Sequence, residues 1–195
     1  MKDIFTGKLV RLSAFDPEEM SKAFPRWYQN SEYVRLLNSS ARPMQSSKAA
    51  LKWMEKEAEE ISIENYYFSI RTLAEDKLIG EIGLDVVNWP GRDAFVGLGI
   101  GETDYWSKGY GTDVMNVLLR YAFTEINLKR VTLAVFEYNL RAIRSYEKAG
   151  FRHEGRLRRL LNREGRRWDE LFMGVMREEW LELNAPISAE VAVGA

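Results

Sequence analysis

Hydrophobic and polar residues alternate, or form short apolar runs, in seven segments that this pattern predicts as β-strands. These segments are residues 8–15, 66–72, 78–87, 95–102, 130–136, 153–161 and 168–176. Alternation is typical of a half-buried strand, and an uninterrupted run such as RVTLAVF is typical of a strand buried on both faces. Turn-forming residues separate several of these segments. The chain is therefore predicted to form a sheet of about seven strands.

Apolar residues at a helical period mark four further segments. Their expected positions are 16–30, 46–58, around 114–122, and 139–150. Asp16 and Asn139 are favourable N-caps, and Gly150 is typical of the residue that ends a helix. Ser46 or Ser47 is expected to cap the second helix. Residues 31–43 show no clear period and are expected to be irregular and mobile.

The order of these elements predicts the fold class. Helices come first, then strands separated by short turns, then alternating strands and helices. This order favours a single α/β (α+β) domain with a mixed, mostly antiparallel central sheet and about four flanking helices. The domain is expected to span residues 1–183. Residues 184–195 are small and apolar without a period, and they are expected to form a flexible tail.

Composition excludes several classes of function. The 195 residues contain no cysteine and one histidine, so a thiolate or histidine-rich metal site is excluded and no metal is expected. No apolar run approaches the ~18 residues of a membrane span, and the first residues lack the apolar core of a secretory signal. The expected location is the cytoplasm. A formal net charge of −1 gives no general attraction to nucleic acid.

The segment YWSKGYGTD, residues 105–113, follows a predicted strand and precedes a predicted helix. Backbone N–H groups at a helix N-terminus point in one direction, and the helix dipole adds partial positive charge there. Gly109 and Gly111 leave no Cβ between the backbone and a ligand. This loop is predicted to hold a phosphate or pyrophosphate.

Two motifs in this order resemble the GNAT superfamily of acetyl-CoA-dependent N-acetyltransferases. The loop 106–111 resembles that family's Q/R-x-x-G-x-G/A pyrophosphate motif, with Trp106 in place of Gln or Arg. Residues 139–151 resemble its N-x-x-A-x-x-x-Y-x-K-x-G-F signature. The likeness is greatest to the branch of ribosomal-protein N-terminal and spermidine acetyltransferases, in which an E-G…G…D hairpin recurs, matched here by residues 154–155, 165 and 169.

The resemblance implies an enzyme that moves an acetyl group from acetyl-CoA to a primary amine by direct attack in a ternary complex. The acceptor would be a small polyamine-like amine or a peptide N-terminus, and a homodimer is possible. A non-catalytic acyl-CoA-binding or sensing protein of the same fold is the alternative. The implied cofactor contacts are Ile100, Gly101, Lys108, Gly109, Tyr110, Gly111, Thr112, Asn139 and Tyr146.

Transfer to an amine needs a donor for the oxyanion, a route for the amine proton and an acid for the thiolate. By resemblance, a backbone N–H near residues 99–101 stabilises the oxyanion, and Tyr146 protonates the thiolate. Gly97 and Gly99 are explained equally well by a bulge or twist in the strand. The candidates for the base are Glu81, Asp85, Asp93 and Glu102, with Glu81 named first, and ordered water is an alternative route for the proton. Acids of the first two helices could surround an opening, which favours a cationic amine.

Overall fold

A computed structural model of the chain describes residues 3–41, 43–59 and 62–185. Its centre is a seven-stranded sheet in the order β1-β2-β3-β4-β5-β7-β6. The strands are β1 (Val10–Ala14), β2 (Asn65–Thr72), β3 (Leu78–Asn88), β4 (Asp93–Ile100), β5 (Arg130–Phe136), β6 (Arg152–Arg163) and β7 (Arg166–Met176). Among these described strands, β4 and β5 are the one pair that runs in parallel. The predicted mixed, mostly antiparallel sheet is confirmed.

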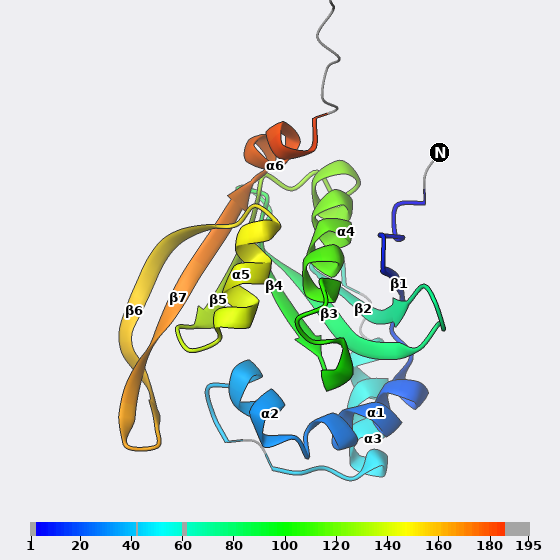
Figure 1. Ribbon diagram of the computed structural model, residues 1–195. Coiled ribbons are helices and arrows are strands. Elements are labelled where there is room, and N and C mark those ends of the chain that lie inside the picture. The colour runs from blue at the N-terminus through cyan, green and yellow to red at the C-terminus, as the bar shows by residue number, and fades with distance from the viewer. Residues whose placement is uncertain (1–2, 42, 60–61, 186–195) are drawn as a thin grey trace, which may run out of the picture.

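The helices are α1 (Pro17–Trp27), α2 (Ser31–Leu37), α3 (Ser47–Glu59), α4 (Tyr110–Thr124), α5 (Leu140–Lys148) and α6 (Arg177–Asn184), with a short 3-10 turn η1 (Thr103–Tyr105). Figure 1 shows α4 and α5 in front of the sheet, α1, α2 and α3 gathered at its lower end, and α6 following β7 at the upper end. In the part of the chain that the structure describes, no helix is long and apolar enough to cross a membrane.

The described residues therefore form six α-helices where about four were predicted, and α2 is the more important correction. It lies within the segment that was expected to be irregular. The Asn30 side chain accepts hydrogen bonds from the N–H groups of Glu32 and Tyr33, which caps the helix. Tyr33 is 3% exposed, so tertiary packing stabilises a helix too short to be stable alone.

The other additional helix, α6, docks by an aromatic contact. Trp180 packs against Phe123 of α4, with the ring centroids 5.7 Å apart. Glu179 accepts a hydrogen bond from the Met176 N–H at the start of the helix. The expected tail lies, from residue 186 onward, outside the described residues.

One buried carboxylate connects the chain's first strand to α4. Asp113, in the first turn of α4, accepts hydrogen bonds from the N–H groups of Lys8, Leu9 and Val10. A Cβ on Gly7 would overlap this carboxylate, so glycine allows the close approach. Since hydrogen bonds to a charged group are stronger than neutral ones, this anchor fixes the N-terminal end of α4 relative to the sheet.

The parallel pair β4–β5 creates the opening that holds the candidate site. The two strands pair only from Asp93 to Phe95 and from Arg130 to Thr132. Beyond these residues β4 continues to Ile100 and β5 to Phe136 without pairing to each other. Figure 1 shows β4 and β5 separating as they run toward α2.

Candidate active site

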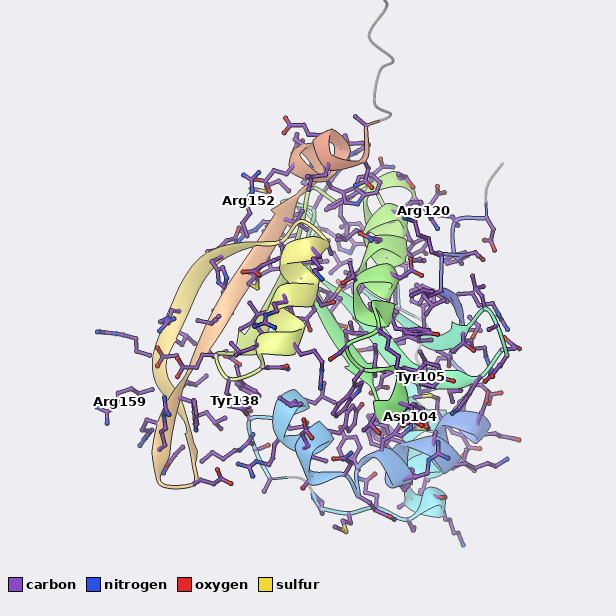
Figure 2. All side chains as sticks on the ribbon, in the orientation of Figure 1. Asp104, Tyr105, Arg120, Tyr138, Arg152 and Arg159 are labelled. Carbon is purple, nitrogen blue, oxygen red and sulfur yellow. The ribbon has the colours of Figure 1, made fainter. Side chains whose placement is uncertain are left out.

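A cavity of about 730 Å³ lies at the separation of β4 and β5. This volume is typical of a small-molecule or cofactor site. Its walls come from β4, β5, the loop before α4, and α5, and α2 and β7 close the remaining sides. Figure 2 shows Tyr105, one of the lining residues, at the N-terminal end of α4. Of the predicted site residues, those lining the cavity are Ile100, Gly109, Gly111, Thr112, Asn139 and Tyr146.

The loop before α4 presents unpaired backbone donors. None of the N–H groups from Lys108 to Thr112 donates to an acceptor among the described residues, and the first paired one belongs to Asp113. Gly109 has φ of 89°, a left-handed conformation that glycine adopts without steric cost. The expected geometry of an anion cradle is therefore present. The Lys108 and Tyr110 side chains do not line the cavity, and Tyr110 packs edge-on against Tyr105.

Two residues of α5 face the same ligand space. The Asn139 side chain accepts a hydrogen bond from the Ala142 N–H at 3.2 Å and so caps the helix as predicted. Tyr146 lies two turns further on, with its side chain 8% exposed. Burial raises the pKa of Tyr146 to about 12, so the phenol stays protonated at neutral pH. Within the described residues its hydroxyl has no hydrogen-bond partner.

Gly101, just after the end of β4, does not have the role that was expected of it as a cofactor contact. The N–H groups of Gly101 and Glu102 both donate to the carbonyl of Ile79, which is the pattern of a β-bulge. Gly101 is therefore not a free donor, and it does not line the cavity. A Cβ at Gly101 would overlap the Trp27 ring, so glycine is required there for packing. Because N–H directions alternate along a strand, the Ile100 N–H points toward the β5 side.

The two glycines within β4, Gly97 and Gly99, sit in regular strand pairs. Gly97 lies opposite Gly83 and Gly99 opposite Glu81, without a shift in register. The bulge that was an alternative explanation for them occurs instead at residues 101–102. A Cβ on Gly99 would collide with the Tyr33 hydroxyl. Gly99 therefore lets α2 approach the sheet.

Glu81, the tentative base, does not line the cavity. It is partly buried on β3, opposite Gly99, and lies near Tyr33. Burial, with a smaller effect of the nearby Glu81 carboxylate, holds the pKa of Tyr33 well above its usual value. Tyr33 is one of the lining residues, and its buried hydroxyl has no hydrogen-bond partner among the described residues.

The cavity contains an acidic residue, Glu170, that was not among the site residues predicted from the sequence. It lies on β7 opposite Phe136 and is the one carboxylate among the described lining residues. Burial raises the pKa of Glu170 above its usual value. The acids of α1 and α3 that were expected around an opening do not line the cavity in the described part of the chain. The sequence did contain a signal for this position. Side chains alternate between the two faces of a strand, so Glu170 lies on the same face of β7 as Phe172, which also lines the cavity.

Trp106, the departure from the GNAT loop motif, is held from two sides. Its indole N–H donates to the Ile100 carbonyl at 2.7 Å. The Arg141 guanidinium lies over its ring, 3.7 Å from the centroid. Trp106 thus connects β4 to α5 across the mouth of the cavity, and a side chain of α5 brings a cation to this loop.

The helix α2 is fixed to the β6–β7 hairpin on the far side of the cavity. Arg163 of the hairpin donates to the carbonyls of Arg35 and Asn38 and to the Tyr138 hydroxyl. Tyr138 itself donates to the Arg35 carbonyl at 2.6 Å. Figure 2 shows Tyr138 at the start of α5, between that helix and the hairpin. This network holds the C-terminal end of α2 over the cavity.

Comparisons with known proteins agree with this geometry. Residues 10–152 match the model of the acetyltransferase (GNAT) domain family. The SPbeta prophage-derived uncharacterized N-acetyltransferase YokL of Bacillus subtilis (strain 168) is 27% identical over 181 residues, which cover 92% of this chain and 96% of that protein. In Bacillus subtilis, the probable N-acetyltransferase YjcK is 31% identical over 117 residues, covering 60% of this chain and 64% of that protein.

Solved structures share the fold. A spermidine N-acetyltransferase from Vibrio cholerae, in complex with CoA and spermine, has a TM-score of 0.76 at 23% identity, covering 88% of this chain and 98% of that chain. An acetyltransferase of the GNAT family from Bacillus anthracis has a TM-score of 0.72 at 19% identity, with coverages of 89% and 98%. The family match spans more than half of the chain, and it coincides with the cavity, the amide cradle and the signature helix. The chain therefore belongs to the GNAT family of N-acetyltransferases, whose members take their acetyl group from acetyl-CoA.

Proposed function

We propose that this chain transfers an acetyl group from acetyl-CoA to the primary amine of a cationic acceptor, a small polyamine-like amine or a peptide N-terminus. Transfer occurs by direct attack of the amine within a ternary complex. The observation that carries the proposal is the distribution of charge and of hydrogen-bond donors around this cavity. Free backbone amides and cationic side chains lie along α4 and α5, and a carboxylate, Glu170, lies on the β7 side.

The first part of the cavity fits the phosphates of CoA. Each charge-assisted hydrogen bond from an amide of Lys108 to Thr112 would contribute about 1.5–3 kcal/mol to binding. Gly109 and Gly111 allow the ligand to approach these amides closely. Asn139, at the start of α5, would contact the pantetheine arm between β4 and β5. These residues bind and orient the acetyl donor.

The central part of the cavity fits the chemistry of acyl transfer. The Ile100 N–H, directed to the β5 side, is the donor we assign to the developing oxyanion. Gly101 cannot serve, because its N–H is bonded to Ile79. Tyr146 supplies a proton to the departing thiolate, since its hydroxyl lies in the cavity wall and is protonated at neutral pH.

The third part of the cavity fits a cationic acceptor. Glu170 provides the negative charge, and the unpaired Tyr33 hydroxyl provides a hydrogen-bond donor or acceptor. An amine with a pKa near 10.4 is about one part in a thousand neutral at pH 7, so the reaction needs a group that takes up a proton. Glu170 is in the cavity, and Glu81 remains a second candidate next to Tyr33. Spermine in the Vibrio cholerae structure supports a polyamine.

A non-catalytic acyl-CoA sensor with the same fold is the competing proposal. The cavity favours catalysis, because a sensor would have no use for a buried phenol that is free to donate beside the gap between β4 and β5. We also propose a cytoplasmic location and a homodimeric assembly for this enzyme.

A panel of amines tests the proposal. Purified protein is mixed with acetyl-CoA and, in turn, spermidine, an aminoglycoside, peptides with free N-termini and a hydroxyl acceptor. Release of free thiol and the mass of the acetylated product are measured. The proposal predicts turnover with at least one cationic amine. Turnover with hydroxyl acceptors alone would contradict it, and binding of acetyl-CoA without turnover for any acceptor would favour the sensor.

A further inference from the structure

The outermost strand of the sheet carries a high concentration of arginine. β6 is the last strand in the sheet order, so one of its edges has no neighbouring strand among the described residues, and residues 152–160 are all exposed. The segment 152–167, in β6 and the start of β7, contains seven arginines, no lysine and two carboxylates. Seven positive and two negative groups leave a formal charge of +5 on this segment, in a chain whose net charge is −1.

Part of this charge holds the fold together. Both carboxylates of the segment pair with arginines outside it. The arginines that have partners elsewhere in the chain are Arg152, Arg156 and Arg163. The other four are exposed and pair with no carboxylate among the described residues: Arg158, Arg159, Arg166 and Arg167. We call these four, together with Leu157 and Leu160, the arginine edge.

A strained bulge presents part of the arginine edge to solvent. Between Leu157 and Leu161, the three residues 158–160 lie opposite Asp169 alone. Arg159 has φ of 56°, a left-handed conformation that residues other than glycine adopt rarely. Its N–H donates to the Asp169 carboxylate at 2.7 Å, which holds the bulge in place. Figure 2 shows the Arg159 side chain directed away from the body of the protein. Strain of this kind is typical of binding surfaces.

Two exposed leucines accompany these cations. Leu157 and Leu160 stand on either side of Arg158 and Arg159, and each leucine is 47% exposed. A hollow in the hairpin surface is lined by Arg156, Leu157, Arg158, Arg159 and Asp169. The Asp169 carboxylate already accepts hydrogen bonds from Arg156 and from the Arg159 N–H. The arginine edge therefore offers free cations and apolar contacts side by side.

We propose that the arginine edge is a docking surface for an acidic segment of a partner polypeptide, in which apolar residues stand beside glutamate or aspartate. A guanidinium binds a carboxylate through paired N–H donors, so four arginines without acidic partners match a segment that carries several acids. None of the four lines the cavity. The inference therefore goes beyond the proposed function and does not depend on acetyl transfer.

Two other occupants fit the arginine edge less well. A nucleic-acid backbone would satisfy the arginines, but its phosphates offer no apolar contact to Leu157 and Leu160. A second copy of this chain, related by a two-fold axis, would place the arginines of one copy against those of the other. Like charges facing one another across an interface oppose association. Charge and apolar surface together thus favour an acidic polypeptide.

Fluorescence anisotropy with labelled probes, at about physiological ionic strength, tests the surface. The main probe is a short synthetic peptide of glutamate and leucine. Its matched forms have serine in place of every leucine, or lysine in place of every glutamate, and a single-stranded RNA of similar length is the fourth probe. The wild-type protein should bind the glutamate–leucine peptide at least about tenfold more tightly than either matched form.

Variants of exposed residues locate the binding. Arg158→Gln/Arg159→Gln should weaken binding of the glutamate–leucine peptide at least about tenfold, and Arg166→Gln/Arg167→Gln on the other strand should also weaken it. Leu157→Ser/Leu160→Ser should abolish the preference for leucine over serine. Lys22→Gln/Lys48→Gln removes the same charge from exposed positions on α1 and α3 and should leave the affinity unchanged. Circular dichroism and Tm verify that each variant is folded.

The outcomes decide between the occupants. A wild-type protein that binds no acidic peptide, or arginine variants that bind as tightly as wild type, would overturn the docking surface, and the arginines would then serve to keep the exposed edge from pairing with other sheets. Equal binding of the leucine and serine peptides would reduce the interaction to charge attraction and overturn it as well. RNA that binds more tightly than the peptide, and is lost in the same variants, would replace the polypeptide with a nucleic acid. All of these results leave the proposed acetyl transfer standing.

Discussion

The hydroxyl oxygens of Thr112 and Ser145 lie 3.0 Å apart, which joins the first turn of α4 to the middle of α5. These two helices form opposite walls of the cavity, one with free amides and the other with Asn139 and Tyr146. The contact therefore sets the width of the site at the position of the amide cradle. Gly111 is packed into the same junction, since a Cβ there would lie 3.1 Å from the Ser145 hydroxyl.

Replacing Gly111 with valine should weaken acetyl-CoA binding by at least about tenfold, because the side chain would push α5 away and block the amides. Titration calorimetry measures the affinity, and circular dichroism checks that the variant is folded. Gly155→Val on the exposed strand β6 is a matched control, since a Cβ there meets only Phe172 at 3.9 Å. Unchanged affinity in a folded Gly111→Val variant would show that the backbone amides of residues 108–112 do not bind acetyl-CoA.

Tyr146→Phe should lower kcat about ten- to a thousandfold, roughly 1.4–4 kcal/mol of transition-state stabilisation, with little change in acetyl-CoA affinity or Tm. The ring and its packing remain, and only the hydroxyl is lost. Because burial raises the pKa of Tyr146 to about 12, the phenol is a proton donor throughout the neutral range. Single-turnover kinetics isolate the chemical step. A near-normal rate would mean that water protonates the thiolate.

Glu170→Gln should reduce kcat/KM for a cationic amine and should change its dependence on pH. Burial raises the pKa of Glu170, so the carboxylate is lost as pH falls through a value above its usual one. The ratio of wild-type to variant kcat/KM should be largest above that pKa and should approach one below it. The same shift means that ionised Glu170 costs stability as pH rises, so the variant should be no less stable at neutral pH.

Kinetics over a range of pH, with acetyl-CoA saturating, checks this prediction. Using the ratio of the two enzymes cancels the titration of the amine itself, which affects both equally. Glu178→Gln, a change in an exposed carboxylate of α6 that does not line the cavity, serves as the control. A ratio that does not depend on pH would show that Glu170 neither binds the acceptor nor takes up its proton.

Arg163→Ala should raise KM for the acceptor about tenfold, with a smaller effect on acetyl-CoA binding, because the guanidinium holds the C-terminal end of α2 through two carbonyls and the Tyr138 hydroxyl. Arg166→Ala removes a neighbouring arginine that stacks on Trp168 and should leave KM near normal. Steady-state kinetics, with acetyl-CoA and the acceptor varied in turn, give the two KM values for each variant. An equal rise in KM for acetyl-CoA would indicate general loss of structure.

Local signals in the sequence were sufficient for the elements that define the cofactor side of the cavity. Arg130–Phe136 forms β5 as predicted. Asn139 caps α5, and Gly150 has the left-handed φ of 101° that a glycine after a helix adopts. These features depend on residues within a few positions of one another, so they are visible before the fold is known.

The opposite side of the cavity, formed by α2 and the β6–β7 hairpin, depends on contacts between residues that are distant in the sequence. These contacts were not predicted. Arg163 contacts the Arg35 carbonyl across 128 positions of sequence, and Tyr33 packs where Gly99 has no side chain. Nothing local in 31–43 reveals these partners, although Asn30 was an available cap for α2. Gly101 was expected to contact the cofactor, and the structure shows instead that this glycine accommodates the Trp27 ring.

The most direct test of the account is thiol release from acetyl-CoA, followed with and without a saturating cationic amine identified in the panel. The account predicts that acetyl-CoA alone gives neither free thiol nor acetylated protein, that adding the amine gives stoichiometric thiol and acetylated amine, and that Tyr146→Phe slows this release without changing acetyl-CoA affinity. Stable acetylation of the protein before the amine is added would contradict direct attack. Tight acetyl-CoA binding with no thiol release for any amine would contradict the enzymatic function.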